Sequence, residues 1–572
     1  QEASRLLGFR SAWLGCRMWR HILRTWPEQA SGLVCSASRA RAPPRGDYRG
    51  FWLLAASGAT AASFASVKCE SLSEMESRKR TLRLALSVAA QKAGCSLVGG
   101  HPVSEEELGY VYKCADGTQM TEAKVQMLKG ALDSLVKDSQ GLISDKVTYD
   151  AALVEMAGQT HALTLLSSRV KPEVEVIKCG GHMRLSGYNA SGFSHNTAYL
   201  ALEGYELRLH ESGGVLLTPG GCTDVAKTDK AQTERVILET RDWACTQGAA
   251  SLGMVNGKQE VGRERKDFIL AAEYRQEARL RDIVRQIQTC APPAGTALKS
   301  NIRVICIAGP TSSGKTTFAN KLCQYLSNEG MPSAVLTVDH YYLPLDQQPR
   351  YQPRKQRSDV DYDHIESMDV DLVNDHIMAV IRGEEIKKPV YNMKTGYRDP
   401  PGKPFKLPEN GILVIEGIHA LNPLYTEKVP REKVFKIFLS PMTALQIDDV
   451  SVVKSTDSRL LRRMSRDYLF RGHSASRTLS MWANVRRGEG QWIFPFQGQA
   501  DFVMNSAHEY ELNVLKPLVE PLLRGVPPSD ANFEKAQELL ALLDNVAAWY
   551  EKDVPGTSLL REFLGNGAYD EH

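Results

Sequence analysis

Residues 302–322 read IRVICIAGPTSSGKTTFANKL, and this stretch decides the fold of the C-terminal half. An apolar strand leads into Gly309, and the residues from Gly309 to Thr316 complete the pattern G-x-x-x-x-G-K-[ST] at the start of a helix. Such a loop gathers backbone N–H groups around a polyphosphate at the positive end of the helix. We therefore expect Lys315 to reach the outer phosphates of a nucleotide and Thr316 to ligate Mg²⁺.

Two acids follow other apolar strands of the same region. Asp339 comes directly after the strand at 333–338, and Glu416 ends the strand in ILVIEG. Open α/β sheets place their ligands at the carboxyl ends of the strands. We expect Asp339 to accept the proton of a substrate hydroxyl or to hold the metal, and Glu416 to be a second metal-linked carboxylate. The ordinary alternative is that each acid caps a neighbouring helix.

Arginines recur on one face of a predicted helix at 456–470. Arg459, Arg463 and Arg466 stand at i, i+4 and i+7, and Arg471 follows the helix. Positive donors that close over a transferring phosphoryl group stabilise its charge and exclude water, as a lid does. A solvated basic face is the other explanation of such a run.

The region from 301 to 530 alternates apolar strands with helices. The strands are IRVICIAG, SAVLTVD, GILVIEG and VFKIFLS, and helices are expected at 316–328, 367–382, 456–470 and 507–524. This alternation predicts an α/β fold with a parallel sheet covered on both faces. Another helical segment, 533–552, precedes a short tail.

The preceding region has a mixed α+β pattern. RKRTLRLALSVAAQKAG and EAKVQMLKGALDSLV predict amphipathic helices, residues 173–220 alternate like a small antiparallel sheet, 263–288 predicts a charged helix, and 290–301 is a Pro/Gly linker. The predicted divisions are a presequence (1–70), an α+β domain (71–165), a mainly antiparallel β subdomain (166–255), a helix and linker (256–300), the α/β domain (301–530), and a C-terminal helix and tail (531–572).

The first 49 residues hold nine arginines, no lysine and three acids, with apolar side chains interleaved. This composition is typical of an organellar presequence, and we expect a mitochondrial location with a plastid as the alternative. The uncharged stretch 50–67 is at the short end for a bilayer span of about 20 residues. It is consistent with a weak membrane anchor, with part of the transit peptide or with a low-complexity arm.

Composition excludes other classes of protein. The chain of 572 residues is 42% hydrophobic and 24% charged with a net charge of +3, so neither a disordered chain nor a global positive field for nucleic acid is indicated. The 11 cysteines form no C-x-x-C pair, which favours a reducing compartment over a disulfide framework. Cys179 and His182 have ligand-like spacing, but no second pair completes a zinc site.

The motifs GPTSSGKTT, VDHYY, YDHIESMD, PVYNMKTG, ILVIEGIHALN and RLLRRMSRDYLFRG, in this order, resemble the uridine kinase and phosphoribulokinase family of P-loop kinases. The segments MWANVRRGE, IFPFQ, NSAHEYELNVLKPLVEPLL and SLLREFLG are similar to a bacterial-type subfamily. In that subfamily the kinase domain follows a region similar to the N-terminal domains of threonyl-tRNA synthetase. The resemblance extends over about 79–572.

The resemblance implies ATP and Mg²⁺ as cofactors and phosphoryl transfer to the hydroxyl of a small molecule, most simply a nucleoside. It implies a catalytic acid or base at Asp339, a metal-linked carboxylate at Glu416, ribose recognition by Asp363 and base contact by Tyr391. The implied lid arginines are Arg463, Arg466 and Arg471. The implied nucleotide site consists of Gly309, Pro310, Thr311, Ser312, Ser313, Gly314, Lys315, Thr316 and Thr317.

The N-terminal half departs from the synthetase pattern. The helix that carries paired histidines in the synthetase reads RTLRLALSVAAQ here, and KCGGHMRLSGYN keeps only Cys179 of the later cluster. Editing chemistry is therefore not expected, and an RNA-binding or scaffolding role for residues 79–220 stays open. So do a nucleotide-binding structural subunit of an organellar complex, as the alternative to an enzyme, and a homo-oligomer.

The kinase half also departs from uridine kinases at substrate positions. The histidine that contacts the pyrimidine there aligns with Gly396, the arginine after the lid's Arg-Gly with His473, and a later glutamine with Met481. A site that loses polar contacts to its substrate loses discrimination for it. We therefore expect uridine and cytidine to be non-preferred acceptors, unless Lys394 or Tyr397 replaces the lost contacts.

Overall fold

The computed structural model describes residues 72–569, except 104–108, 169–172, 186–192, 195, 203, 221–230, 259–262, 349–361 and 394. The expected presequence, 1–70, with its uncharged stretch 50–67, lies outside the described residues. Residues 69–572 form one compact unit. Among the helices that the structure describes, none combines the length and the apolar character needed to cross a membrane.

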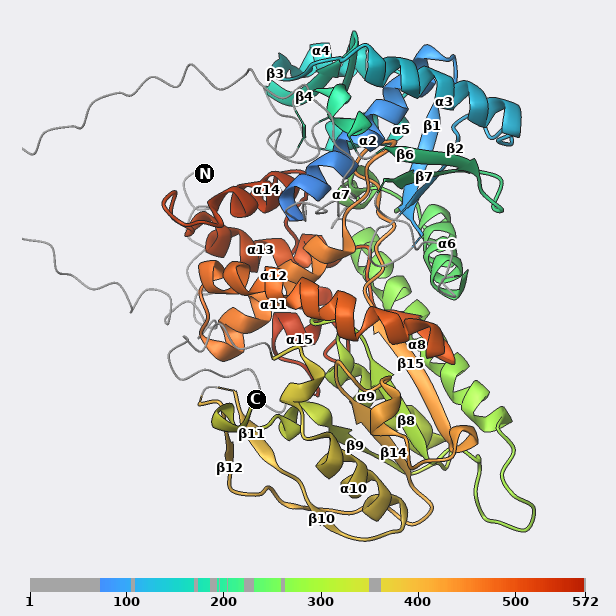
Figure 1. Cartoon of the computed structure of the whole chain (residues 1–572), viewed down its shortest axis with the longest axis vertical. Helices are drawn as coiled ribbons and strands as arrows, with labels where there is room; N and C mark the ends of the chain where they lie inside the picture. Colours follow the sequence, from blue (N-terminus) through green and yellow to red (C-terminus); the bar gives the residue numbers. More distant parts are fainter. Residues whose placement is uncertain are drawn as a thin grey trace, which may run out of the picture. The chain divides into compact units, whose positions relative to one another are not determined.

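The C-terminal half is built on a five-stranded parallel sheet with the order β16-β15-β8-β14-β9 (Figure 1). This confirms the α/β fold expected from the alternation of strands and helices. The strands are β8 (Val304–Ala308), β9 (Ser333–Thr337), β14 (Ile412–Glu416), β15 (Val434–Ser440) and β16 (Phe502–Asn505). The principal helices are α9 (Lys315–Asn328), α10 (Val370–Ile381), α11 (Ser455–Arg471), α12 (Ala475–Trp492), α13 (Glu511–Arg524), α14 (Phe533–Asp544) and α15 (Arg561–Leu564).

Helices cover both faces of this sheet. Ile305 and Ile307 of β8 belong to a buried cluster with Phe318 of α9 and side chains of α8 (Glu264–Thr289). Val304 and Cys306 point to the opposite face, into a cluster that includes side chains of α10. Because successive side chains of a strand point to opposite faces, the uninterrupted apolar run of β8 is explained by burial on both sides.

Two antiparallel sheets form the N-terminal half. One has the order β1-β2-β7-β6 and the other the order β3-β4-β5. The strands are β1 (Leu97–Pro102), β2 (Tyr110–Cys114), β3 (Leu142–Thr148), β4 (Glu173–Cys179), β5 (His182–Leu185), β6 (Tyr205–Leu209) and β7 (Val215–Pro219). The helices are α2 (Leu72–Lys92), α3 (Glu122–Lys137), α4 (Tyr149–Glu155), α5 (Thr160–Ser168), α6 (Ala231–Thr246) and α7 (Leu252–Asn256).

Residues 173–220 differ from the single small sheet that their alternation suggests. β4 and β5 complete a sheet with β3, whereas β6 and β7 complete the sheet of β1 and β2. Each sheet thus takes strands from both sides of residue 166. Alternation of apolar and polar residues reports one buried face of a strand, but it carries no information on which strand lies beside it.

Two helices are shorter than their sequence patterns predict. Helix α13 begins at Glu511 rather than at 507, because the Asn505 side chain accepts from the Ala507 N–H and fixes a turn after β16. Helix α14 ends at Asp544 rather than at 552. The chain then turns so that the Trp549 N–H donates to the carbonyl of Asn513 (2.9 Å) on α13.

A segment just before α11 joins the two halves. Gln446 forms an isolated parallel bridge with Ser251 through backbone hydrogen bonds to Ala250 and Leu252 (3.0 and 2.8 Å), and its side chain donates to the carbonyl of Gly99 (2.6 Å). The N–H of Gly99 donates to the carbonyl of Asp449 (3.1 Å), and Arg83 donates to the carbonyl of Val450 (2.7 Å). The segment 446–450 therefore lies in contact with both α2 and β1.

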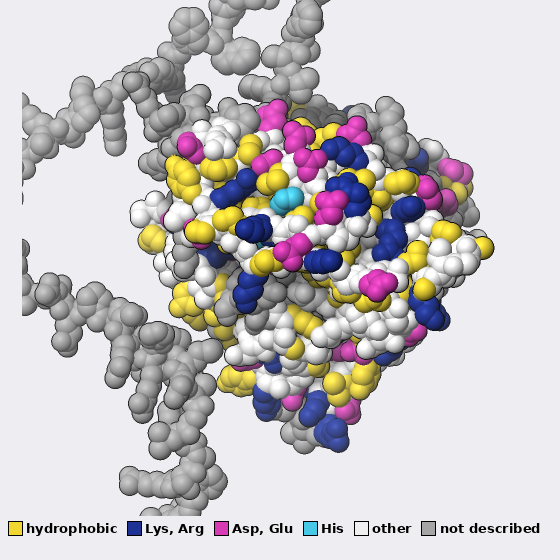
Figure 2. Space-filling view, turned by 90° about the horizontal axis from the view of Figure 1, so that it is seen from below, with side chains coloured by type: hydrophobic (Ala, Val, Ile, Leu, Met, Phe, Trp, Pro, Cys, Tyr) yellow, Lys and Arg dark blue, Asp and Glu magenta, His cyan; other side chains and the backbone are white. Residues whose placement is uncertain are grey.

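Acidic and basic side chains are mixed over the described part of the face shown in Figure 2. This agrees with the near balance of 70 basic and 67 acidic residues in the sequence. A one-sign surface of the kind that attracts nucleic acid is therefore not a feature of this face.

Candidate active site

The loop between β8 and α9 has the backbone that its sequence predicts. A Cβ atom at Gly309 would lie 1.9 Å from the carbonyl oxygen of Leu439, so only glycine fits there. Ser312 (φ 60°) and Gly314 (φ 90°) adopt left-handed conformations immediately before α9 begins at Lys315. This path points the first N–H groups of the helix into the loop, where an anion is stabilised.

Lys315 faces the two predicted acids. Its half-buried ammonium donates to the carbonyl of Pro310 (3.2 Å). Burial lowers the pKa of Lys315, and the negative charges of Glu416 and Asp339 oppose this effect. The structure therefore brings together the cation and both carboxylates that the sequence places on three different segments.

Glu416 ends β14 and is buried. Its Oε1 accepts a hydrogen bond from Thr316 Oγ1 (3.2 Å), the hydroxyl expected to ligate Mg²⁺. Burial, and after it the charge of Asp339, raise the pKa of Glu416 to about 7, although Lys315 works in the opposite direction. A second carboxylate close enough to raise the pKa of Glu416 makes this an environment in which a cation is favourable.

Asp339 lies just beyond the end of β9, the strand that pairs with β14. β9 and β14 are parallel and in register, with Thr337 opposite Glu416. A Cβ at Gly417 would lie 3.6 Å from Asp339 Oδ1, which shows how closely the two strand ends approach. Helix capping, the alternative considered for these acids, does not describe Asp339: it sits inside the 3₁₀ turn η4 (Val338–Tyr341), and Glu416 accepts from the Thr316 side chain.

The loop fits a polyphosphate and a divalent cation. The hydroxyl oxygens of Ser312 and Ser313 are buried, and neither has a hydrogen-bond partner among the described residues. Buried polar atoms of this kind are normally satisfied, so their presence in the loop is consistent with an anionic ligand. Thr316, Glu416 and Asp339 supply the oxygen donors that Mg²⁺ prefers.

Three of the predicted lid arginines cluster around one buried acid. Asp467 is an ion-pair partner of Arg463 (3.3 Å), Arg471 (3.2 Å) and Arg466 (3.7 Å). Arg463 also donates to Thr311 Oγ1 (3.3 Å), which ties this group to the phosphate-binding loop. The nearby charge of Arg466, together with burial, lowers the pKa of Arg471 to about 10.

Arg459 has a different role from the one its spacing suggests. Its side chain and that of Glu489 on α12 are both 1% exposed and form a two-pronged ion pair, with one N–O distance of 2.8 Å. Glu489 also accepts from the Thr311 N–H (3.2 Å), and Arg459 donates to the Thr311 carbonyl (3.3 Å). Arg459 therefore stabilises the loop through the backbone of Thr311. Because its side chain is buried, Arg459 is not part of a solvated basic face.

The predicted substrate residues Asp363 and Tyr391 surround a buried tyrosine. The ring centroid of Tyr391, on β11 (Val390–Asn392), lies 5.3 Å from that of Tyr342, and the Tyr362 ring lies 5.9 Å from Tyr342. Burial first, then the charges of Asp339 and Asp363, raise the pKa of Tyr342 well above its ordinary value. Aromatic rings and two acids thus share one neighbourhood at the carboxyl edge of the sheet.

The positions that depart from uridine kinases are partly accounted for. Gly396 has φ +82° and accepts from the Leu345 N–H (2.9 Å), so it serves a turn. His473 is an ion-pair partner of Asp467 (3.8 Å) if protonated, and Met481 lies half-buried on α12. Tyr397 is exposed. Lys394 lies outside the described residues.

Sequence reasoning missed Glu489 and His419. Glu489 lies in MWANVRRGE, but no spacing rule connects an acid to an arginine 30 residues earlier. His419 follows Glu416 in ILVIEGIHALN, is 2% exposed, and has a pKa lowered to about 4 by burial. Its position three residues after the strand-end acid Glu416 is the sequence signal from which His419 could have been predicted near the site.

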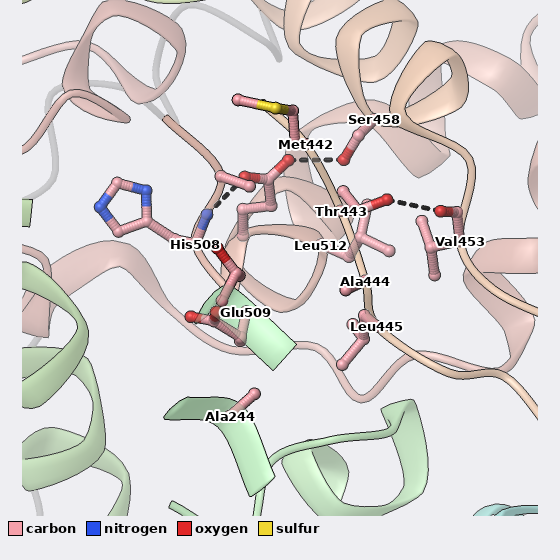
Figure 3. A pocket seen from close by; sticks show the side chains of 13 residues that line it. Ala244, Met442, Thr443, Ala444, Leu445, Val453, Ser458, His508, Glu509 and Leu512 are labelled. Atoms are coloured by element: carbon pink, nitrogen blue, oxygen red, sulfur yellow. Dashed lines mark hydrogen bonds between the residues drawn. The ribbon is translucent and has the colours of Figure 1, made fainter. Parts of the chain in front are cut away.

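A small cavity of about 20 Å³ lies between α6, the segment after β15 and the start of α13 (Figure 3). Thr443 donates to the Val453 carbonyl at its edge, and Glu511 accepts from Ser458 and from the His508 N–H (3.0 Å). The volume suits about one water molecule, so the cavity is no nucleoside site.

In the N-terminal half, Cys179 and His182 lie opposite each other in the β4–β5 hairpin. Burial raises the pKa of the Cys179 thiol. No third metal-ligating side chain among the described residues joins this pair. Cys179 and His182 therefore form a cross-strand pair of the hairpin, and a zinc site is not indicated.

Residues 304–513 match the Phosphoribulokinase / Uridine kinase family. A uridine kinase from Oceanobacillus iheyensis is 25% identical over 225 residues, covering 38% of this chain and 95% of that protein. A uridine kinase from Staphylococcus aureus is 28% identical over 225 residues, covering 38% of this chain and 96% of that protein.

A solved structure described as a possible uridine kinase from Bacillus stearothermophilus is 17% identical, with a TM-score of 0.26, and covers 40% of this chain and 100% of that one. The family match confirms the resemblance of the C-terminal region and supports ATP-dependent phosphoryl transfer to a small molecule. The comparisons do not confirm the resemblance of the N-terminal half to threonyl-tRNA synthetase.

Proposed function

Because residues 304–513 match this kinase family, we propose that the chain transfers the γ-phosphoryl group of ATP to a hydroxyl of a nucleoside-like small molecule. The observation that carries the proposal is the meeting of Lys315, Glu416 and Asp339 at the carboxyl edge of the sheet. The adjacent loop holds the buried hydroxyls of Ser312 and Ser313, which have no hydrogen-bond partner among the described residues. Aromatic rings lie directly behind Asp339.

In this proposal, different residues bind the phosphates, hold the metal and accept the proton. Lys315 and the N–H groups of the loop hold the outer phosphates, and Arg463, Arg466 and Arg471 approach them from α11. Thr316 and Glu416, with Asp339 nearby, would hold Mg²⁺, which would supply positive charge to the phosphate oxygens. Asp339 orients the acceptor hydroxyl and takes its proton.

The acceptor is proposed to carry a flat ring and vicinal hydroxyls. Tyr391 and Tyr342 provide stacking surface, and Asp363 provides a carboxylate for ribose hydroxyls. Gly396 lacks the side chain that contacts a pyrimidine in uridine kinases, so we propose that uridine and cytidine are not the preferred acceptors.

A screen of nucleosides and simple sugars with radiolabelled ATP tests the function. We expect transfer to at least one purine nucleoside. We also expect Asp339→Asn to abolish transfer while ATP still binds, since an amide cannot accept the proton. Selective phosphorylation of uridine would reject the acceptor proposal. Loss of ATP binding in Asp339→Asn would reduce Asp339 to a metal ligand.

A further inference from the structure

The C-terminal tail, residues 551–569, is fastened beside the phosphate-binding loop. Ser465 of α11 donates to the carbonyl of Phe563 (2.7 Å), and Lys321 of α9 donates to the carbonyl of Thr557 (3.1 Å). Phe563 is completely buried, and Leu559 lies 3.8 Å from the position of a Cβ on Gly314. The tail begins well beyond residue 513, where the family match ends.

One side chain of this tail bridges two phosphate-binding elements. Glu562 Oε1 accepts from Arg466 NH1 (3.3 Å) on α11, and Oε2 accepts from Thr317 Oγ1 (3.4 Å) in the loop. The Glu562 side chain is 17% exposed and that of Arg466 is 15% exposed. A single carboxylate thus fixes the distance between an arginine of the lid and the loop.

Arg466 depends on this carboxylate for its direction. Its other acidic neighbour, Asp467, lies 3.7 Å from Nε and is shared with Arg463 and Arg471. Nε of Arg466 has no hydrogen-bond partner among the described residues. With one donor held by Glu562, the guanidinium keeps other donors available for a phosphate.

Glu562 also lies within the electrostatic field of the phosphate site. Its charge opposes the lowering of the pKa of Lys315 and adds to the raising of the pKa of Glu416, in both cases as a contribution smaller than that of burial. A negative charge so close to a polyphosphate site is unfavourable unless it serves an arginine there.

We propose that the C-terminal tail completes the active site and that Glu562 is a positioning residue, which holds Arg466 where it contacts the nucleotide phosphates. The inference rests on the proposed function for its effect on turnover. Its effect on nucleotide binding is independent of the acceptor.

The test is a double-mutant cycle in the full chain, with Glu562→Gln, Arg466→Ala and the combined variant, and with Glu551→Gln in the same tail as control. Affinity for ATP with Mg²⁺ is measured by calorimetry, and kcat with the best acceptor. We expect Arg466→Ala to weaken ATP binding about tenfold in the wild-type background and less than about twofold in the Glu562→Gln background. Glu562→Gln should lower kcat about tenfold, while Glu551→Gln leaves it unchanged.

Equal effects of Arg466→Ala in both backgrounds would overturn the proposal, as would a Glu562→Gln variant that binds ATP more tightly and turns over faster, because Glu562 would then obstruct the site. If Glu562→Gln unfolds at a lower temperature, Glu562→Asp keeps the charge, shortens the reach and should show the same loss of coupling. A wild-type chain that binds ATP but phosphorylates no acceptor would reject the proposed function, and the binding cycle would still decide the role of Glu562.

Discussion

Glu416 in the C-terminal half and Glu234 in the N-terminal half are both buried carboxylates with opposite electrostatics. Burial raises the pKa of each, but the neighbour of Glu416 is another acid, Asp339, and its pKa reaches about 7. Glu234 lies against His101 (3.7 Å) and His210 (3.4 Å), and its interactions with these two histidines lower its pKa to about 2. The carboxylate of Glu416 thus has another acid as its neighbour, whereas that of Glu234 has two histidines.

The same difference extends to the arginines. In the N-terminal half, Arg184 donates to Ser87 (2.9 Å) and Gln91 (2.9 Å), and Arg83 donates to Tyr112 (3.1 Å). In the C-terminal half, Arg463, Arg466 and Arg471 all pair with Asp467, and Arg466 also pairs with Glu562, so three cations share two acids beside the phosphate-binding loop. Buried charge alone therefore does not identify a functional site, whereas several like charges gathered at a sheet edge indicate a candidate site.

The strongest way to test this contrast is Lys315→Ala. The ammonium neutralises phosphate charge and adds little to the core, so we expect kcat to fall about 10²–10³-fold with an unchanged melting temperature. Steady-state kinetics and thermal unfolding measure the two effects, with exposed Lys428→Ala as the control. A folded Lys315→Ala enzyme that turns over at the wild-type rate would place the active site elsewhere.

A second test separates supporting from phosphate-binding arginines. Arg459→Met leaves Glu489 buried with one charge partner fewer, and we expect a loss of about 3–5 kcal/mol in the free energy of unfolding. Urea denaturation measures the loss, and Arg459→Met combined with Glu489→Leu should recover part of it. If Arg459→Met instead keeps its stability and loses only kcat, Arg459 acts on the phosphates, as its helical spacing suggests.

A smaller effect is expected for Glu234→Gln. The ionised form of Glu234 is stabilised in the folded chain, so its contribution is present above its unfolded pKa near 4.5 and is lost as the pH falls toward 2. The variant should melt a few degrees below wild type at pH 6, a loss of about 1 kcal/mol. The gap should narrow below pH 4.5 and close near pH 2. His101, His210 and Arg241 are the charged groups nearby. A gap independent of pH would show that packing, not charge, explains the effect.

The sequence predicts the centre of this site because the chemistry there is local or follows strand order. The loop from Gly309 to Thr317 is continuous, and Asp339 and Glu416 are found by the rule that ligands bind beyond the carboxyl ends of parallel strands. The i, i+4 spacing of the arginines wrongly assigns Arg459 to the lid. This spacing places side chains on one face of a helix, but it does not say which partner that face contacts.

Other parts of the structure depend on contacts between distant segments. The bridge from Glu562 to Thr317 spans 245 positions in the chain, and the contact of Gly488 with Asp363 joins α12 to a turn before α10. In the N-terminal half, strands with similar alternation enter two different sheets. Periodicity describes each element by itself, so neither the pairing of strands nor the partners of buried charges could be predicted from it.

The contacts of the segment 446–450 set an order for synthesis of the chain. Gly99 and Ala250, which bind Gln446 and its neighbours, leave the ribosome well before residue 446 does. Domains generally fold from the N-terminus as they emerge. The nascent N-terminal half must therefore keep backbone groups open for a segment that arrives about 200 residues after Ala250 and 347 residues after Gly99. This segment leads into α11.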